Sequence, residues 1–445
     1  MSKPARLIGF ALVLAAGAAL TLPLLKSQES VAQPGAGEGS VIFFHPDGMG
    51  VNTWGAVRMM TVGPDGRLNW DQLPHMAVYT GHMKDRLTST SHGGATVHAY
   101  GVKVLADSYG MDGTEPLTAA SGFKGSILQE AQAAGLAVGM VNSGTITEPG
   151  SGAFAASSPD RYAHQSIALQ ILESGAEVIL GGGEQYFLPD GVEGLYGSGA
   201  REDGRDLIAE ARAQGYTVVR TREELLSLPD SATRVLGLFA FYHTFNDQPE
   251  ERLLEKGLVA WPEEAPTIAE MTQVALDVLS RSGRRFFLVA EEEGSDNMSN
   301  ANNAMGEIIA GQRADEAIGA IRAFIADNPK TLMVMTSDSD AGGMQVFGQP
   351  FPSDTAPARA SNGAPMDGVE GTNGCLFMSA PDANGVRHPV TVAWAQYHDV
   401  SGGILMKADG LGADQVHGTM DNTDAYRVMY SVLFGPLPGR EGNQP

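Results

Sequence analysis

Short apolar runs alternate along the chain with longer segments whose apolar positions recur at helical spacing. The runs read VIFFH, AVGMV, EVILGG, VLGLFAF, FFLVA, TLMVM and VTVAWA. The segments between them include SILQEAQAAG, RYAHQSIALQILESG and TIAEMTQVALDVLSRSG. Apolar strands that alternate with such helices are typical of a mainly parallel sheet covered on both faces. The pattern therefore predicts an α/β fold, with a three-layer αβα sandwich around a large, mostly parallel central sheet.

The alternation contains no internal repeat and no clear linker, so we expect one domain over about residues 40–437. Within it, residues 344–375 break the pattern because they are rich in Gly, Pro, Ser and Asp. Long segments of that composition are usually surface loops. We therefore expect a loop-rich excursion near the ends of the strands.

The first 32 residues have the pattern of a secretory signal peptide. A basic start precedes an apolar run over residues 7–25, and residues 30–32 read SVA, which suits cleavage. Because the apolar run is long for a signal, an uncleaved membrane anchor is the alternative. Cys375 is the only cysteine, so no disulfide can form within the chain. Export without disulfides suggests a periplasmic or secreted protein.

Acidic residues outnumber basic ones by 52 to 29, which gives a net charge of -23. A surface of this sign repels nucleic acids and anionic membranes, and no basic cluster offsets it. We therefore expect no nucleic-acid partner, and no stable membrane partner unless the N-terminal segment is retained. An anionic substrate would require a local positive site, most simply metal ions and an arginine.

Acidic side chains directly follow three of the predicted strands. Asp47 ends the VIFFHPDG segment, Glu291–Glu293 and Asp296 follow FFLVA, and Asp338 and Asp340 follow TLMVM. Open α/β sheets bind ligands at this edge, and buried carboxylates require a cation or a hydrogen-bond donor. The pattern predicts divalent cations. The alternatives are a helix cap for Asp47 and a solvated charge run for the glutamates.

Other segments supply groups that could act on a phosphoryl group. Ser91 lies near the start of a predicted helix, where N–H groups and the helix dipole favour an anion, although an ordinary N-cap is the alternative. Arg161 could hold a phosphate through two hydrogen bonds. We expect His98 in the core, whereas His92 and His398, which follows VTVAWAQ, could bind metal. Together these groups predict metal-assisted hydrolysis of an anionic ester.

In this order the motifs resemble the alkaline phosphatase family, from about residue 40 to residue 435. PDGMG resembles the metal-bridging aspartate turn, and TSTSHGGAT followed by GVK resembles the nucleophile segment. VILGGG, PTIAEMTQVALDVL and GTMDNTDAYRVM fall in the family's order. The resemblance implies an alkaline phosphatase-like fold and hydrolysis of small phosphate monoesters through a phosphoserine. It also implies Mg and Zn as cofactors and allows a homodimer.

The resemblance assigns roles to single residues. Ser91 matches the nucleophile and Arg161 matches the clamp on the substrate phosphate. The implied metal ligands are Asp47, Glu148, Glu291, Asp296, Asp338 and His398.

Four positions depart from the family pattern, and one of them is Gly150, where a hydroxyl ligand of the third metal site is usual and Ser151 is adjacent. Thr90 precedes the implied nucleophile where aspartate is usual, and Asn300 and Ser339 stand where zinc-binding histidines are usual. Oxygen ligands suit magnesium, calcium or manganese better than imidazole does. We therefore expect an oxygen-rich metal site that still includes positions 300 and 339. The possible replacement ligands are His92, Glu292, Glu293 and Asp340, and Thr90 is a further possible site residue.

Two other functions remain open from the sequence. The first is a phosphodiesterase of the same superfamily, which would use similar groups. The second is a catalytically weakened protein that binds phosphate or metal, because two of the usual zinc-binding histidines are replaced.

Overall fold

The computed structural model describes residues 37–347, 366–369 and 376–438. The predicted signal peptide, Cys375 and most of the predicted excursion lie outside these residues. Over the part of the chain that is described, no helix combines the length and the apolar character needed to cross a membrane.

A ten-stranded sheet forms the centre of the molecule, with the strand order β17-β2-β16-β10-β1-β9-β5-β6-β8-β7. Neighbouring strands are parallel except at β16, which runs antiparallel to both β10 and β2. The prediction of a large, mostly parallel sheet is therefore confirmed. The strands are β1 (Ser40–Pro46), β2 (His75–Thr80), β5 (Ala137–Thr145), β6 (Val178–Gly182), β7 (Thr217–Val219), β8 (Val235–Leu238), β9 (Phe286–Glu292), β10 (Thr331–Met335), β16 (Leu405–Gly410) and β17 (His417–Asp421).

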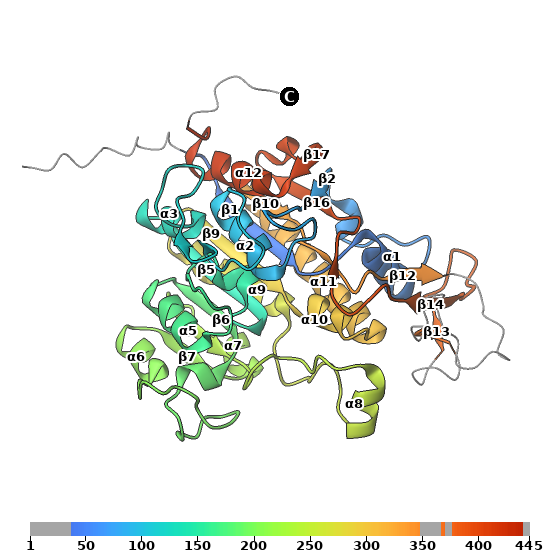
Figure 1. The fold of residues 1–445 in the computed structure, drawn as a ribbon, viewed down its shortest axis with the longest axis horizontal. Helices are drawn as coiled ribbons and strands as arrows, with labels where there is room; N and C mark the ends of the chain where they lie inside the picture. The colour runs from blue at the N-terminus through green and yellow to red at the C-terminus, as the bar shows by residue number, and fades with distance from the viewer. Residues whose placement is uncertain (1–36, 348–365, 370–375, 439–445) are drawn as a thin grey trace, which may run out of the picture. The chain divides into compact units, whose positions relative to one another are not determined.

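Helices cover both faces of this sheet, as Figure 1 shows. Successive side chains of a strand point to opposite faces, so Phe43 lies in one core and Phe44 in the other. One core includes α2 (Ser91–Tyr100), α3 (Ile127–Ala133), α5 (His164–Glu173), α6 (Leu207–Ala213) and α12 (Asn422–Phe434). The other includes α1 (Val51–Thr61), α7 (Arg222–Leu226), α9 (Ile268–Arg281) and α11 (Ala304–Asp327). Burial on both faces explains why the central strands are continuous apolar runs.

The VTVAWA run forms a strand, β14 (Pro389–Ala393), but this strand lies outside the main sheet. It pairs with β12 (Gln345–Phe347) and β13 (Phe377–Met378) in a small antiparallel sheet. Its apolar side chains are buried against Met344 and Trp394 rather than against the central strands. Two further short strands, β11 (Asp340–Ala341) and β15 (Asp399–Val400), pair with each other and bring distant segments together. The remaining short elements are β3 (Met111–Asp112), β4 (Glu115–Pro116), α4 (Pro149–Gly152), α8 (Glu250–Lys256), α10 (Gly294–Asn300) and three 3₁₀ turns.

Candidate metal centre

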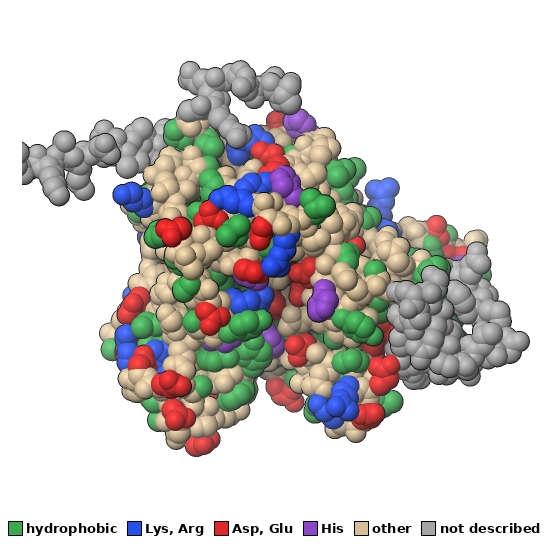
Figure 2. All heavy atoms as spheres, viewed as in Figure 1, with side chains coloured by type: hydrophobic (Ala, Val, Ile, Leu, Met, Phe, Trp, Pro, Cys, Tyr) green, Lys and Arg blue, Asp and Glu red, His purple; other side chains and the backbone are tan. Residues whose placement is uncertain are grey.

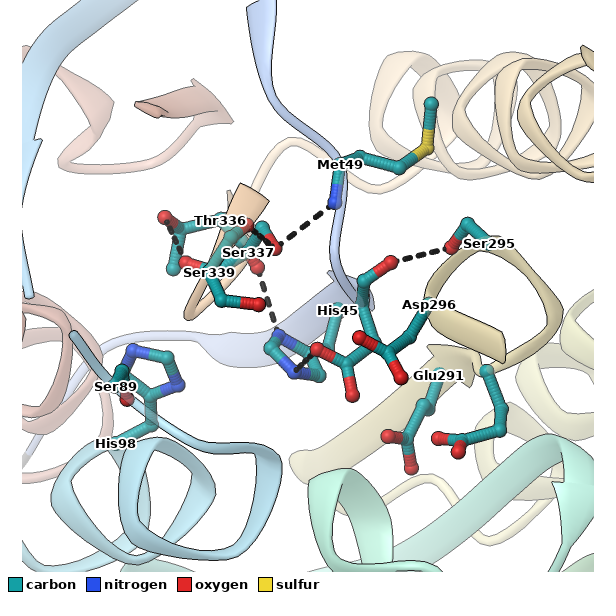
Figure 3. Close-up of polar contacts among 12 residues, drawn as sticks. His45, Met49, Ser89, His98, Glu291, Ser295, Asp296, Thr336, Ser337 and Ser339 are labelled. Atoms are coloured by element: carbon teal, nitrogen blue, oxygen red, sulfur yellow. Dashed lines mark hydrogen bonds and ion pairs between the residues drawn. The ribbon is translucent and has the colours of Figure 1, made fainter. Parts of the chain in front are cut away.

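The candidate site lies where β1, β9 and β10 end, and these three strands are neighbours in the sheet. The register pairs His45 of β1 with Glu291 of β9, so Asp47 emerges beside the end of that strand. Asp338 follows β10, and Asp296 lies on α10, directly after β9. The strands thus deliver side chains that are far apart in sequence to one edge. In Figure 3, His45, Glu291 and Asp296 gather beside the segment that carries Ser339.

Two groups of side chains place their ligand atoms within 4.8 Å of one another. One consists of His45, Asp47 and Glu291, and the other of Asp47, Glu293 and Asp296, so Asp47 belongs to both. Asp47 does not cap the following helix, because the N-cap of α1 is Gly50. The glutamates are buried, which excludes the alternative of a solvated charge run.

Many oxygens of this cluster lack a hydrogen-bond partner among the described residues. They include both oxygens of Asp47 and Asp338 and one oxygen each of Glu291, Glu293 and Asp296. Asp47 Oδ1 does lie 3.3 Å from Nε2 of His45, whose Nδ1 bonds the carbonyl oxygen of Thr336 at 2.8 Å. Unpartnered buried carboxylates are costly, and divalent cations would satisfy them. The donor set therefore fits hard metal ions.

The cluster shifts the protonation of its own members. Burial, followed by the charges of nearby carboxylates, raises the pKa of Glu293, Asp296 and Asp338 well above the usual range. Burial also raises the pKa of Glu291 to about 8. Burial opposes ionisation of Asp47 as well, but its interactions with His45 and Asp338 hold its pKa below the usual value. A bound cation would replace the protons that the other carboxyls retain.

Asn300 joins two carboxylates on one side of the cluster. Its Nδ2 donates to Asp296 Oδ2 at 3.0 Å and to Asp399 Oδ1 at 3.1 Å, while its own Oδ1 has no partner within the described chain. The pairing of β11 with β15 brings Asp399 to this position. The side chain of His398 is exposed, and its carbonyl oxygen accepts from the N–H of Gly342 at 3.1 Å. The structure thus places Asp399, which the sequence analysis missed, where His398 was expected.

The N-terminus of α2 approaches the cluster beside Asp338. Thr90 is the N-cap: its Oγ1 accepts from the N–H of Gly93 at 3.2 Å and donates to the carbonyl oxygen of Ala106 at 2.5 Å. Ser91 is therefore not the cap, and it is 6% exposed as the first residue of the helix. A Cβ on Gly94 would lie 2.5 Å from the Cβ of Asp338, so the helix packs directly against that residue. His98 is buried in the same helix and bonds the hydroxyl of Tyr79 at 2.8 Å, as expected for a core residue.

Arg161 belongs to a chain of polar contacts. Its Nη2 donates to Glu148 Oε2 at 2.8 Å, and its Nη1 lies 3.3 Å from Nδ1 of His92. Nε2 of His92 lies 3.5 Å from Asp107. Burial and then the charge of Arg161 lower the pKa of His92 to about 4, so this imidazole is neutral at neutral pH. His92 and Glu148 therefore contact the guanidinium.

The remaining candidates differ in what they contact. Ser339 is buried, and its Oγ has no partner in the described part of the chain. Glu292 accepts from Ser143 Oγ at 2.6 Å and from the N–H of Gly294 at 3.0 Å. The Asp340 carboxylate packs against Gly50 and Gly402, where a Cβ would lie 2.3 and 1.9 Å from its oxygens. Figure 2 shows acidic side chains in a recess near the middle of the face that it displays.

His45 and Asn142 also contact this cluster and were missed by the sequence analysis. Asn142 donates from Nδ2 to Glu291 and to Ser151 Oγ. Both residues lie inside buried strands. A single polar residue in an otherwise apolar run is the sequence signal that could have identified them, but it does not indicate what the residue contacts.

The model of the alkaline phosphatase family matches residues 39–434. The repressible alkaline phosphatase of Saccharomyces cerevisiae is 29% identical over 328 residues, which cover 68% of this chain but only 55% of the yeast protein. The alkaline phosphatase of Escherichia fergusonii is 28% identical over 346 residues, covering 67% of this chain and 69% of that protein.

Solved structures share the fold. Alkaline phosphatase from the Antarctic bacterium TAB5 superposes with a TM-score of 0.67 at 20% identity, covering 89% of this chain and 98% of its own. The enzyme from Thermus thermophilus gives a TM-score of 0.70 at 23% identity, covering 93% of this chain and 96% of its own.

Proposed function

The chain belongs to the alkaline phosphatase family, and from that premise we propose that it hydrolyses phosphate monoesters through a phosphoserine on Ser91. Membership of the family and the shared fold support a phosphatase activity. The observation that carries the proposal is the packing of α2, whose first residue is Ser91, against Asp338, one of the buried, unpartnered carboxylates at the strand ends.

We propose that oxygen-donor residues hold the cations in two adjoining sets. Asp296, Asn300 and Asp399 form the first, in which Asp399 takes the role that the resemblance gave to His398. Asp47, Asp338 and Ser339 form the second, and Glu291 and Glu293 extend it on the other side of Asp47. Such donors favour Mg²⁺, Ca²⁺ or Mn²⁺ over Zn²⁺. A variant of the Antarctic enzyme was solved with Mg bound in its M3 site.

When bound, the cations would polarise the phosphoryl oxygens and neutralise developing negative charge. Ser91 Oγ attacks phosphorus, and the ester oxygen leaves with the electrons of the broken P–O bond and takes up one proton, equal to the one that the Ser91 hydroxyl gives up, to become an alcohol. Water then attacks the phosphoserine, and Ser91 Oγ leaves with the electrons of its P–O bond and takes up a proton from that water, so that one ester and one water give one alcohol and one phosphate. Arg161 donates hydrogen bonds to the phosphoryl oxygens, and Glu148 holds its guanidinium in place.

The test is phosphate release by wild-type and Ser91→Ala protein after supply of Mg²⁺, Ca²⁺, Mn²⁺ or Zn²⁺ in turn. We expect Ser91→Ala to lower kcat by about 1,000-fold or more, because the covalent step is lost. Ser89→Ala is the matched control, since Ser89 is a buried hydroxyl two residues earlier whose Oγ contacts the sulfur of Met83. Near-normal turnover by Ser91→Ala would exclude a phosphoserine on Ser91 and point to Thr90, Ser89 or a different mechanism.

The same assay separates the two other functions. A diester that is cleaved faster than the monoester with the same leaving group would identify a phosphodiesterase. Phosphate binding without turnover in any metal would identify a weakened homologue.

A further inference from the structure

A row of aromatic side chains borders the candidate site from Arg161 to α10. We call it the aromatic band, and it consists of Tyr162, His164, Tyr186, Tyr242, His243 and Phe245. Each ring contacts the next. Ring centroids are 6.3 Å apart from Tyr162 to His164, 4.6 Å from His164 to Tyr186 and 6.2 Å from Tyr186 to Tyr242. They are 3.9 Å apart from Tyr242 to His243 and 4.9 Å from His243 to Phe245.

The start and the middle of the aromatic band contact residues of the proposed chemistry, and its farther part approaches α10. The guanidinium of Arg161 lies 5.5 Å from the ring centre of Tyr162, and the Tyr242 hydroxyl donates to Glu148 Oε1 at 3.4 Å. His243 Nε2 lies 3.4 Å from Nδ2 of Asn297, the neighbour of Asp296. A leaving group that extends from a phosphate held by Arg161 toward Tyr162 would meet these rings.

The aromatic band is accessible where it begins and remains uncharged along its length. Tyr162 is 71% exposed although it is a large ring, and Tyr186 and Tyr242 are half-buried. Burial lowers the pKa of His164 and His243, so both imidazoles are neutral at neutral pH. A cavity of about 330 Å³ opens beside its far end, lined by Phe241, His243 and Phe245. Exposed aromatic faces next to a polar anchor bind planar ring systems.

We infer that the aromatic band stacks on a planar leaving group, so that the preferred substrates are phosphate monoesters of nucleosides or of other ring-bearing alcohols. The inference rests on the proposed phosphatase function, because it assumes that Arg161 holds the phosphate. It adds a substrate class and a specificity-determining surface. Stacking of this kind contributes about 1–3 kcal/mol per ring, which corresponds to a factor of at least about five in kcat/KM.

The experiment compares adenosine 5′-monophosphate with ribose 5-phosphate on the metal-loaded protein. Both present a phosphate on the same primary alcohol and differ by the adenine ring. Benzyl phosphate against ethyl phosphate repeats the comparison without a nucleobase. We expect the ring-bearing ester to have the higher kcat/KM by about fivefold or more. A preference confined to the benzyl pair would assign simple aromatic alcohols rather than nucleosides.

Variants then locate the preference. Tyr162→Leu removes an exposed ring and should abolish most of it, so that kcat/KM for adenosine 5′-monophosphate falls about fivefold more than kcat/KM for ribose 5-phosphate. Tyr242→Phe keeps the ring and should retain the preference. Phe347→Leu, which removes an exposed ring from β12, is the control and should change neither rate.

Equal kcat/KM values within each wild-type pair would overturn the inference, and so would a preference that survives Tyr162→Leu and Tyr242→Leu together. If no ester is hydrolysed in any metal, the proposed function fails instead. Calorimetric binding of adenosine 5′-monophosphate and ribose 5-phosphate then decides the role of the aromatic band: tighter binding of the nucleotide supports it, and equal binding refutes it.

Discussion

Exchange of Asp399 for asparagine should raise the free energy of unfolding of the metal-free protein. It should lower the additional stability that the protein gains when metal binds. Because Asn300 Nδ2 bonds one oxygen of Asp296 and one of Asp399, at 3.0 and 3.1 Å, these oxygens are at most about 6 Å apart. At that separation, and with an effective dielectric constant of about 20, two ionised carboxylates repel by about 3 kcal/mol. Asp399→Asn removes this repulsion but also removes a carboxylate that we propose as a metal ligand.

The assay is chemical unfolding at pH 9, with a chelator and with saturating Mg²⁺ or Ca²⁺. The high pH is chosen because burial, and then neighbouring acidic charge, raises the pKa of Asp296 and Asp399. We expect Asp399→Asn to stabilise the metal-free protein by up to about 3 kcal/mol. The stabilisation gained on adding metal should fall by about 1.4 kcal/mol or more, which corresponds to a tenfold weaker affinity.

His398→Ala is the matched control, because its side chain is exposed one residue earlier, and it should change stability by less than about 0.5 kcal/mol in both conditions. The reasoning would be refuted if Asp399→Asn destabilised the metal-free protein and left the effect of metal unchanged. The assignment of Asp399 would also fail if His398→Ala, rather than Asp399→Asn, abolished the effect of metal.

Three further predictions concern the same site. Since Glu293, Asp296 and Asp338 have raised pKa values, the folded metal-free protein holds more protons than the unfolded chain, and its free energy of unfolding should fall from pH 5 to pH 9. Chemical unfolding in the presence of a chelator at several pH values tests this, and a free energy of unfolding that does not change with pH would contradict it. Metal binding should release protons at pH 7, seen as heats that depend on the ionisation enthalpy of the buffer, and buffer-independent heats would count against coordination by these carboxyls. Glu148→Gln removes the anion that holds Arg161 and should raise KM about tenfold with a smaller change in kcat; steady-state kinetics would disprove the positioning role if kcat alone fell.

The central strands could be predicted because they are buried on both faces and therefore read as continuous apolar runs. β2 reads HMAVYT with alternating burial, and its pairing with β16 and β17 depends on segments more than 300 residues away in sequence. No local pattern specifies such pairing. The VTVAWA run shows that an apolar run predicts a strand but not the sheet to which the strand belongs. This strand is buried in a small separate sheet instead of the main one.

The carboxylates at the site could be predicted where they lie at the end of a strand or shortly after it, as Glu291, Asp47 and Asp338 do. Asp399 could not, because it depends on two-residue strands that have no sequence pattern of their own. His398 was the natural choice because imidazole is a common metal ligand, yet a shift of one residue in an extended segment turns a side chain to the opposite side. The sequence predicts an acidic site for metal ions. Which of the two adjacent residues, His398 or Asp399, faces the cluster depends on the pairing of β11 with β15.

The pairing of β11 with β15 also fixes when the cluster is completed during biosynthesis. Asp47 leaves the ribosome about 350 residues before Asp399, so a nascent chain carries the first acidic groups before it can arrange them all around an ion. Contacts between segments that are distant in sequence also slow folding. The ion that the protein acquires would therefore be selected in the compartment where folding ends, and not by the ions that surround the ribosome.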